Sequence, residues 1–119
     1  MKRYVDGFVL VIPKKNLKAY QKMATLGGKL WMKHGALQYV ETVAEDMKVM
    51  KGMLAFPKMT KAKPTEVVVF SWIMFKDKKH RNEVNKKVMA DPKMAGDMSD
   101  MPFEMNKMAY GGFETIVNS

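Results

Sequence analysis

The chain has 119 residues, of which 47% are hydrophobic and 28% charged, and its formal net charge is +9. This length suits one hydrophobic core, and the composition excludes disordered, collagen-like and membrane-embedded classes. The chain contains no cysteine, which excludes disulfides, Cys-ligated zinc and a thiol nucleophile. We therefore expect a single domain over residues 1–119.

The first segment, residues 3–12, is rich in β-branched and aromatic residues and ends at Pro13, which predicts a strand. A basic pair before apolar residues is also typical of a signal peptide, but Asp6 interrupts the apolar run and no small-residue cleavage site follows. No apolar stretch approaches the roughly 20 residues that cross a membrane. We expect a cytoplasmic protein.

An amphipathic helix is predicted over residues 14–34, followed by Gly35 as a residue suited to the C′ position. Its apolar residues recur at spacings of three and four: Leu17, Tyr20, Ala24, Gly27 and Trp31. Residues 36–44 then alternate in polarity, which predicts a second strand that leads into the acidic turn at residues 45–46.

Residues 47–64 lack periodicity and predict a long connection with an irregular extended stretch, whereas residues 67–75 form the strongest predicted strand. Asp77 is a suitable N-cap for a second long helix that ends at residues 91–92. A methionine-rich linker over residues 93–106 precedes a final strand at residues 109–117. Within that strand Gly111 and Gly112 indicate a bulge or a close dimer contact.

The resulting order, β-α-β-β-α-β, is typical of the α+β class with a ferredoxin-like fold, in which two helices cover one face of a four-stranded antiparallel sheet. In residues 67–75 both alternating sets of side chains are apolar, and residues 3–12 are nearly so. Each large apolar side chain left in water would forgo about 1.5–3 kcal/mol of burial. We therefore expect a homodimer in which a second sheet covers the free face.

The basic character of the chain rests on lysine, because 19 of its 21 basic residues are lysines and only Arg3 and Arg81 are arginines. Bidentate recognition of phosphates and bases favours arginine, and the lysines are scattered, so a solvated surface is the main interpretation. RNA binding by exposed sheet aromatics stays open as an alternative, as does dimerisation within a larger assembly.

Six strings together resemble the YbaA-like family of bacterial proteins, domain-of-unknown-function family 1428. They lie at residues 4–8, 34–37, 69–72, 89–92, 101–103 and 110–114. The resemblance implies a dimeric α/β-barrel of the kind found in antibiotic-biosynthesis monooxygenases, and it implies no catalytic residue. The chain departs from the family pattern at residues 47–53 and 104–106.

Four polar residues are candidates for chemistry. Asp6 and Glu41 are carboxylates on predicted strands, and each is either a buried acid with a raised pKa or a residue that lies near a sheet edge or pairs with lysines. Ser71 either faces a cavity or is satisfied by a backbone carbonyl, and His34 either caps the first helix or has a catalytic role. His80, among lysines at the start of the second helix, is a weaker candidate.

Aromatic residues are the candidates for ligand binding: Trp31, Tyr39, Trp72 and Tyr110 either wall a pocket or pack in the core. The 14 methionines suit Cu(I) in principle, but methionine is also a flexible core filler, and no nucleotide or metal motif is present. We therefore expect no cofactor and no metal. The leading hypothesis is a protein that binds or processes a small apolar or aromatic metabolite, whether or not it is an enzyme; if it is one, cofactor-free proton transfer or oxygenation suits its residues.

Overall fold

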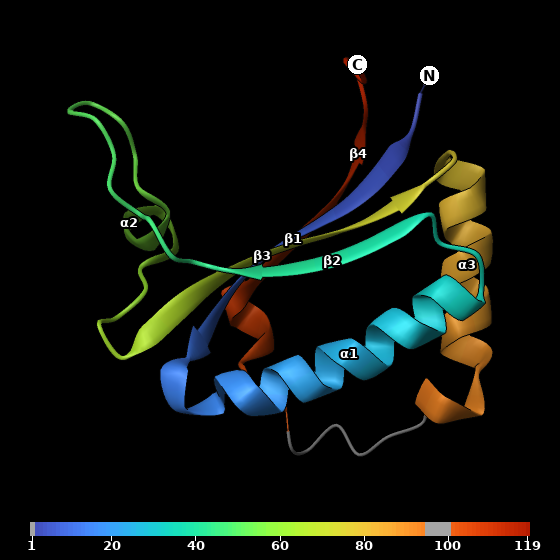
Figure 1. Ribbon diagram of the computed structural model, residues 1–119, viewed down its shortest axis with the longest axis horizontal. Coiled ribbons are helices and arrows are strands. Elements are labelled where there is room, and N and C mark those ends of the chain that lie inside the picture. Colours follow the sequence, from blue (N-terminus) through green and yellow to red (C-terminus); the bar gives the residue numbers. More distant parts are fainter. Residues whose placement is uncertain (1, 95–100) are drawn as a thin grey trace.

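The computed structural model describes residues 2–94 and 101–119, which form one four-stranded sheet with the strand order β2-β3-β1-β4 (Figure 1). The strands are β1 (Tyr4–Pro13), β2 (Gln38–Val43), β3 (Glu66–Phe75) and β4 (Met108–Glu114). Every neighbouring pair is antiparallel. The α+β class and the antiparallel sheet are therefore confirmed, with strand bounds within three residues of the predicted ones.

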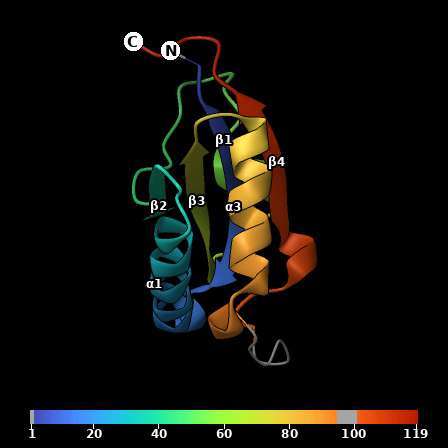
Figure 2. The same cartoon turned by 90° about the vertical axis from the view of Figure 1, so that its right-hand side faces the viewer.

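Two long helices, α1 (Leu17–Lys33) and α3 (Lys78–Ala90), lie on the same face of the sheet (Figure 2). Asp77 caps α3 as predicted, because its carboxylate accepts a 2.7 Å hydrogen bond from the backbone N–H of His80. α1 ends at Lys33 with His34 as its C-cap, and Gly35 follows with φ 109°, a conformation that favours glycine. None of the helices in the described ranges is long and apolar enough to cross a membrane.

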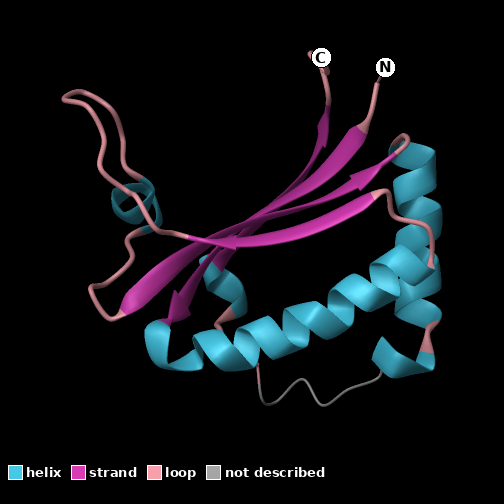
Figure 3. Cartoon of the chain, viewed as in Figure 1, coloured by secondary structure: helices cyan, strands magenta, loops and turns pink. Residues whose placement is uncertain are grey.

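The connection between β2 and β3 is long and mostly irregular, as predicted, and it also contains a short helix that the sequence did not predict, α2 (Phe56–Thr60). Pro57 lies in its first turn, where proline is tolerated, and Lys61 closes it in the left-handed conformation. Five residues are too few to show a helical repeat in sequence. The connection projects from the side of the sheet away from α1 (Figure 3). Of the predicted linker at 93–106, residues 95–100 lie outside the described residues.

The core lies between the sheet and the two long helices, and it consists of two clusters of buried side chains. Alternate residues of each strand point into it, as the pleat requires. The first cluster contains Leu10, Ile12, Tyr20, Ala24, Val69 and Phe103, and the second contains Leu30, Ala36, Ile73, Phe75, Val84 and Val88. Asp6 and Ser71, both buried, belong to the same side of the sheet.

The opposite side of the sheet, which we call the open face, carries the other alternating set of side chains. Its positions are Val5, Gly7, Val9, Val11, Pro13, Gln38, Val40, Thr42, Glu66, Val68, Phe70, Trp72, Met74, Ala109, Gly111 and Phe113. Only one of these sixteen positions is charged, Glu66 at the start of β3, and its carboxylate pairs with Lys107. Phe56 of α2 packs edge-on against Phe70, yet Phe70 remains 45% exposed and Phe113 61% exposed. The open face is therefore apolar and largely uncovered.

The two glycines of β4 lie in an unbroken register, Gly111 opposite Gly7 and Gly112 opposite Asp6. The predicted bulge is therefore wrong. A Cβ at Gly112 would come within 2.8 Å of ring carbons of Tyr4, whereas a Cβ at Gly111 would meet Phe113 at an ordinary 3.5 Å. Gly112 is thus required by the passage of the Tyr4 ring over the strand.

Gly112→Ala is expected to lower the free energy of unfolding by about 1–3 kcal/mol, because the Tyr4 ring must move to admit the methyl group. Gly111→Ala is the matched control, since it adds the same methyl group one residue away without a clash. Urea unfolding of the two variants makes the comparison. Equal stability of both would contradict this account of Gly112.

Candidate functional site

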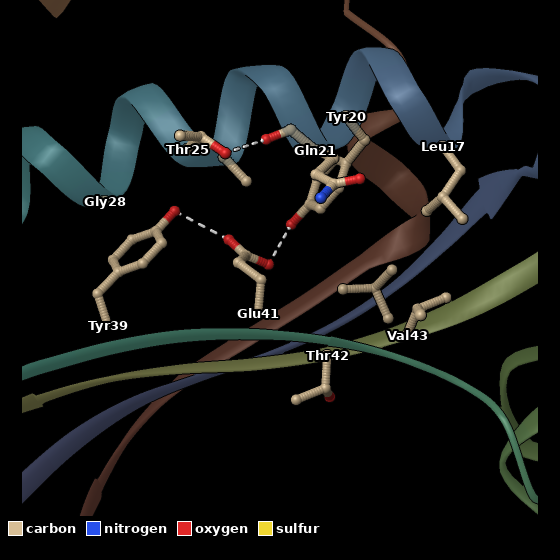
Figure 4. Close-up of a pocket in the computed structure, with 11 residues that line it drawn as sticks. Leu17, Tyr20, Gln21, Thr25, Gly28, Tyr39, Glu41, Thr42 and Val43 are labelled. Atoms are coloured by element: carbon tan, nitrogen blue, oxygen red, sulfur yellow. Dashed lines mark hydrogen bonds between the residues drawn. The ribbon is translucent and has the colours of Figure 1, made fainter.

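Glu41 of β2 extends toward α1 and accepts hydrogen bonds from two tyrosines (Figure 4). The hydroxyl of Tyr20, on α1, donates to Oε1 at 2.7 Å, and the hydroxyl of Tyr39, on β2, donates to Oε2 at 2.9 Å. Thr42, the next residue of β2, points to the other side of the strand (Figure 4). The period of two along a strand thus brings Tyr39 and Glu41 onto the helix side together.

Both tyrosines are held in the protonated form. Burial raises the pKa of Tyr20 and of Tyr39 well above the ordinary value, and the neighbouring Glu41 carboxylate raises it further. Ser71, buried opposite Glu41 on β3, lies close enough to the Tyr20 hydroxyl to oppose slightly the rise in the pKa of Tyr20. The result is a small polar group of three hydroxyls and one carboxylate inside an apolar layer.

Two cavities adjoin this polar group, and Tyr20, Ala24, Tyr39 and Glu41 line both. The outer cavity, of about 420 Å³, lies between α1 and the edge strand β2. The inner cavity, of about 350 Å³, lies between α1 and the sheet, and exposed Met23 and Leu26 are among the residues around it. Its volume falls in the range of small-molecule sites, which are typically apolar with a few convergent polar groups.

The walls of the inner cavity are mainly aromatic and aliphatic. Its aromatic lining includes Phe8, Tyr20, Trp31, Tyr39 and Phe103. The rings of Trp31 and Tyr39 lie 6.1 Å apart, and those of Tyr20 and Phe103 lie 5.8 Å apart edge to face. Met94, Met101 and Met108 add flexible thioether side chains, which adapt to ligands of different shape.

Asp6 belongs to a different polar cluster, at the interface of β1, β4 and α3. Arg81 donates to Asp6 at 3.2 Å and to the hydroxyl of Tyr110 at 2.6 Å, and Asn85 donates to the other Asp6 oxygen at 3.4 Å. Burial raises the pKa of Asp6 above its ordinary value, and the Arg81 guanidinium opposes that rise. Trp31 donates to Asn85 at 3.0 Å, which links this cluster to α1. Asp6 lies on an inner strand and pairs with an arginine, so the alternative of a sheet-edge position or lysine partners is wrong for it.

His34 and Asp91 join the C-terminal ends of the two long helices. His34 Nε2 lies 2.8 Å from Asp91 Oδ2, and Lys33 donates to the same oxygen at 3.1 Å. Hydrogen bonds from the backbone of Lys93 and from His34 and Lys33 hold the pKa of Asp91 well below its usual value. His34 is also the C-cap of α1. These contacts give His34 a structural role, as the C-cap of α1 and as a link between the two helix ends.

The predicted catalytic and ligand-binding residues do not all lie at one site. Glu41, Ser71, Tyr39, Trp31 and Trp72 all line the inner cavity, and the indole N–H of Trp72 donates to Gln38 on the open face. Tyr110 lies in the Asp6 cluster and stacks on Phe8. Among the described residues no group of three or more His, Asp or Glu side chains is placed to hold a metal.

Sequence reasoning missed Tyr20 and Arg81 as members of polar clusters. Tyr20 was identified only as part of the apolar stripe of the first helix, and that stripe does show that it faces the sheet. Its pairing with Glu41 carries no signal in a single sequence, because it depends on where α1 crosses β2. Arg81 lies among lysines in the sequence, and only its contacts with Asp6 and Tyr110 in the structure distinguish it from them.

Known proteins resemble this chain along nearly its whole length. "Uncharacterized protein YbaA" of Escherichia coli (strain K12) is 41% identical over 116 residues, which is 98% of each chain, and the protein of the same description from Shigella flexneri matches equally. Among solved structures, the de novo designed protein Foldit4 matches with a TM-score of 0.44 and 10% identity, covering 99% of this chain and all of the other. The family model described as "Protein of unknown function (DUF1428)" matches residues 3–105. The chain therefore belongs to the DUF1428 family.

Proposed function

We propose that the protein binds, and if it is an enzyme transforms, a small apolar or aromatic molecule in the inner cavity. The observation that carries the proposal is the Glu41 carboxylate, held by two tyrosine hydroxyls at the edge of an otherwise apolar cavity of about 350 Å³. Ligand sites in proteins typically combine such apolar walls with a few placed polar groups.

Glu41 is the residue suited to orient the ligand or to accept a proton from it. A general base must lie within hydrogen-bond reach of the proton that it removes, and Glu41 borders the cavity directly. Ser71 lies opposite it on β3 and lines the same cavity. Asp6 does not line either cavity near Glu41, so its role in this proposal is to hold α3 on the sheet.

We also propose that the protein is a homodimer of ferredoxin-like subunits, arranged as a dimeric α/β-barrel. The strand order β2-β3-β1-β4, with α1 and α3 on one face, supports the subunit fold. The open face supports the dimer, because its one charged residue, Glu66, already pairs with Lys107, and a second copy can cover the rest of the face without bringing a charge out of water. Since each chain carries a charge of +9, a face with no unpaired charge is where two copies meet with least repulsion.

RNA binding on the open face is less well supported. Its exposed aromatics, Phe70 and Phe113, could stack bases, but none of its sixteen positions is a lysine or arginine that would contact phosphates. RNA would also compete with a second copy for the same surface. Absence of a salt-dependent shift with single-stranded RNA at low salt would end this alternative.

The proposal is tested by filling the inner cavity. Ala24 is buried and lines it, so Ala24→Phe is expected to weaken binding of small aromatic molecules at least tenfold. Ala19→Phe, the same substitution at an exposed position of α1, is the matched control. Native mass spectrometry and Trp fluorescence report the binding, and circular dichroism reports the fold. If wild type and Ala24→Phe retain the same ligands with the same affinity, the inner cavity is not the binding site.

A further inference from the structure

Glu41 differs from the other shielded carboxylates in having no cationic partner. Four Asp or Glu side chains in residues 2–94 and 101–119 are buried or half-buried: Asp6, Glu41, Glu66 and Asp91. Asp6 pairs with Arg81, Glu66 with Lys107, and Asp91 with Lys33 and His34. Within the same ranges no ion pair reaches Glu41, although the chain has 21 lysines and arginines.

A shielded carboxylate without a counter-charge is costly, because it loses hydration that neutral hydroxyls replace only in part. Tyr20 and Tyr39 each donate one hydrogen bond to Glu41, one to each oxygen. A carboxylate has about four acceptor positions, so about two remain open beside the cavity. The negative charge itself stays uncompensated.

The two tyrosine hydroxyls have no hydrogen left for a ligand, because both donate to Glu41. What the group presents to the cavity is therefore a set of acceptors: carboxylate and phenolic lone pairs. A ligand that carries donors fits this set, and a ligand that carries a carboxylate or phosphate does not.

The aromatic walls favour the same kind of ligand. Trp31, Tyr39, Tyr20 and Phe103 surround the cavity next to Glu41, and aromatic faces attract organic cations within about 6 Å. Of the described residues lining the inner cavity, the only basic one is Lys93, which is exposed. Aromatic faces together with an unpaired carboxylate make an environment suited to an ammonium group.

From these observations we infer that the ligand of the inner cavity is an apolar organic amine, bound as its ammonium form with the charge at Glu41 and the apolar body between α1 and the sheet. This inference rests on the proposed function, because it needs the inner cavity to be the binding site. It adds the chemical class of the ligand and the group that selects it.

The experiment compares three probes with the same aromatic body and different charge: 2-phenylethylamine, 2-phenylethanol and 3-phenylpropionate. Affinities for the full chain are measured by calorimetry or ligand-observed NMR at one pH and salt concentration. The amine is expected to bind at least tenfold more tightly than the alcohol, and the carboxylate most weakly. Glu41→Gln is expected to weaken the amine at least tenfold and the alcohol less than threefold.

Glu83→Gln is the matched control, since it removes the same charge from an exposed position of α3. It is expected to change neither affinity, which separates a local effect of Glu41 from a change in overall charge. If Glu41→Gln does not fold, Glu41→Asp keeps the charge and is expected to keep the preference for the amine. A folded Glu41→Asp without that preference would contradict the inference.

The two proposals fail in different ways. If the alcohol or the carboxylate binds wild type as tightly as the amine, and Ala24→Phe removes that binding, the cavity is a ligand site but the amine assignment is wrong. If no probe binds, or if all bind equally to wild type and Ala24→Phe, the proposed function fails and the amine assignment fails with it.

Discussion

Replacing Arg81 with alanine is expected to destabilise the folded protein by about 3–5 kcal/mol at neutral pH, the usual cost of removing one partner from a buried ion pair. Asp6 is 2% exposed, and Arg81 is its cationic partner. Arg81 also donates to the hydroxyls of Tyr110 and Tyr4. Its loss therefore leaves a buried carboxylate without a counter-charge and removes the side-chain hydrogen bonds that Arg81 makes from α3 to β1 and β4. Urea unfolding at pH 7 measures the effect.

The loss of folding stability caused by Arg81→Ala is expected to depend on pH, because it depends on the protonation of Asp6. Burial already raises the pKa of Asp6, and Arg81 is what opposes that rise, so the pKa is higher still without Arg81. A carboxyl whose pKa is raised on folding favours the folded state when protonated and disfavours it when ionised. The difference in stability between wild type and Arg81→Ala is therefore expected to shrink as the pH falls toward the ordinary Asp pKa of about 3.9.

Two controls separate this ion pair from general effects. Lys86→Ala removes a positive charge from an exposed position of the same helix and is expected to change stability by less than about 0.5 kcal/mol. Asp6→Asn combined with Arg81→Ala removes the buried charge and is expected to be more stable at pH 7 than Arg81→Ala alone. A pH-independent loss, or none, would contradict the account.

Phe70→Glu is expected to convert a dimer into a monomer. Wild type should elute at twice the chain mass of 13.6 kDa, and the variant at the single mass, over micromolar concentrations. Phe70 lies on the open face and is 45% exposed in the single chain, so the substitution spares the core. In a two-fold dimer each interface would bury two unpaired carboxylates, which costs several kcal/mol. Light scattering coupled to gel filtration makes the measurement.

Met89→Glu is the matched control for the dimer. Met89 is 63% exposed and lies on α3, in the helical layer on the other side of the sheet. It is expected to remain dimeric with wild-type stability. A wild type that is monomeric at every concentration, or a Met89→Glu variant that dissociates as readily as Phe70→Glu, would remove the open face as the contact between copies.

The sequence by itself determined the secondary structure of most of the chain, because the side-chain period is a local property. Alternation of apolar residues placed β3 at 67–75, one residue short of its observed start at Glu66, and the Asp77 cap placed the beginning of α3. The apolar character of both faces of β3 also appeared in sequence, and its second face is the open face. Helix α2 was not predicted, because its five residues are too few to show a helical repeat of apolar side chains.

Only the tertiary structure decided which side chains meet. Tyr20 and Glu41 are 21 residues apart, and Asp6 and Arg81 are 75 apart. Each pair depends on where a helix crosses the sheet, which is set by packing of the whole core and leaves no trace in local periodicity. The same packing separated Tyr39, Trp31 and Trp72, which line the inner cavity, from Tyr110, which belongs to the Asp6 cluster. The sequence shows that aromatic residues and carboxylates are present. Only the crossing of α1 over β2 places Glu41 at the cavity, where no cationic side chain of the described residues pairs with it.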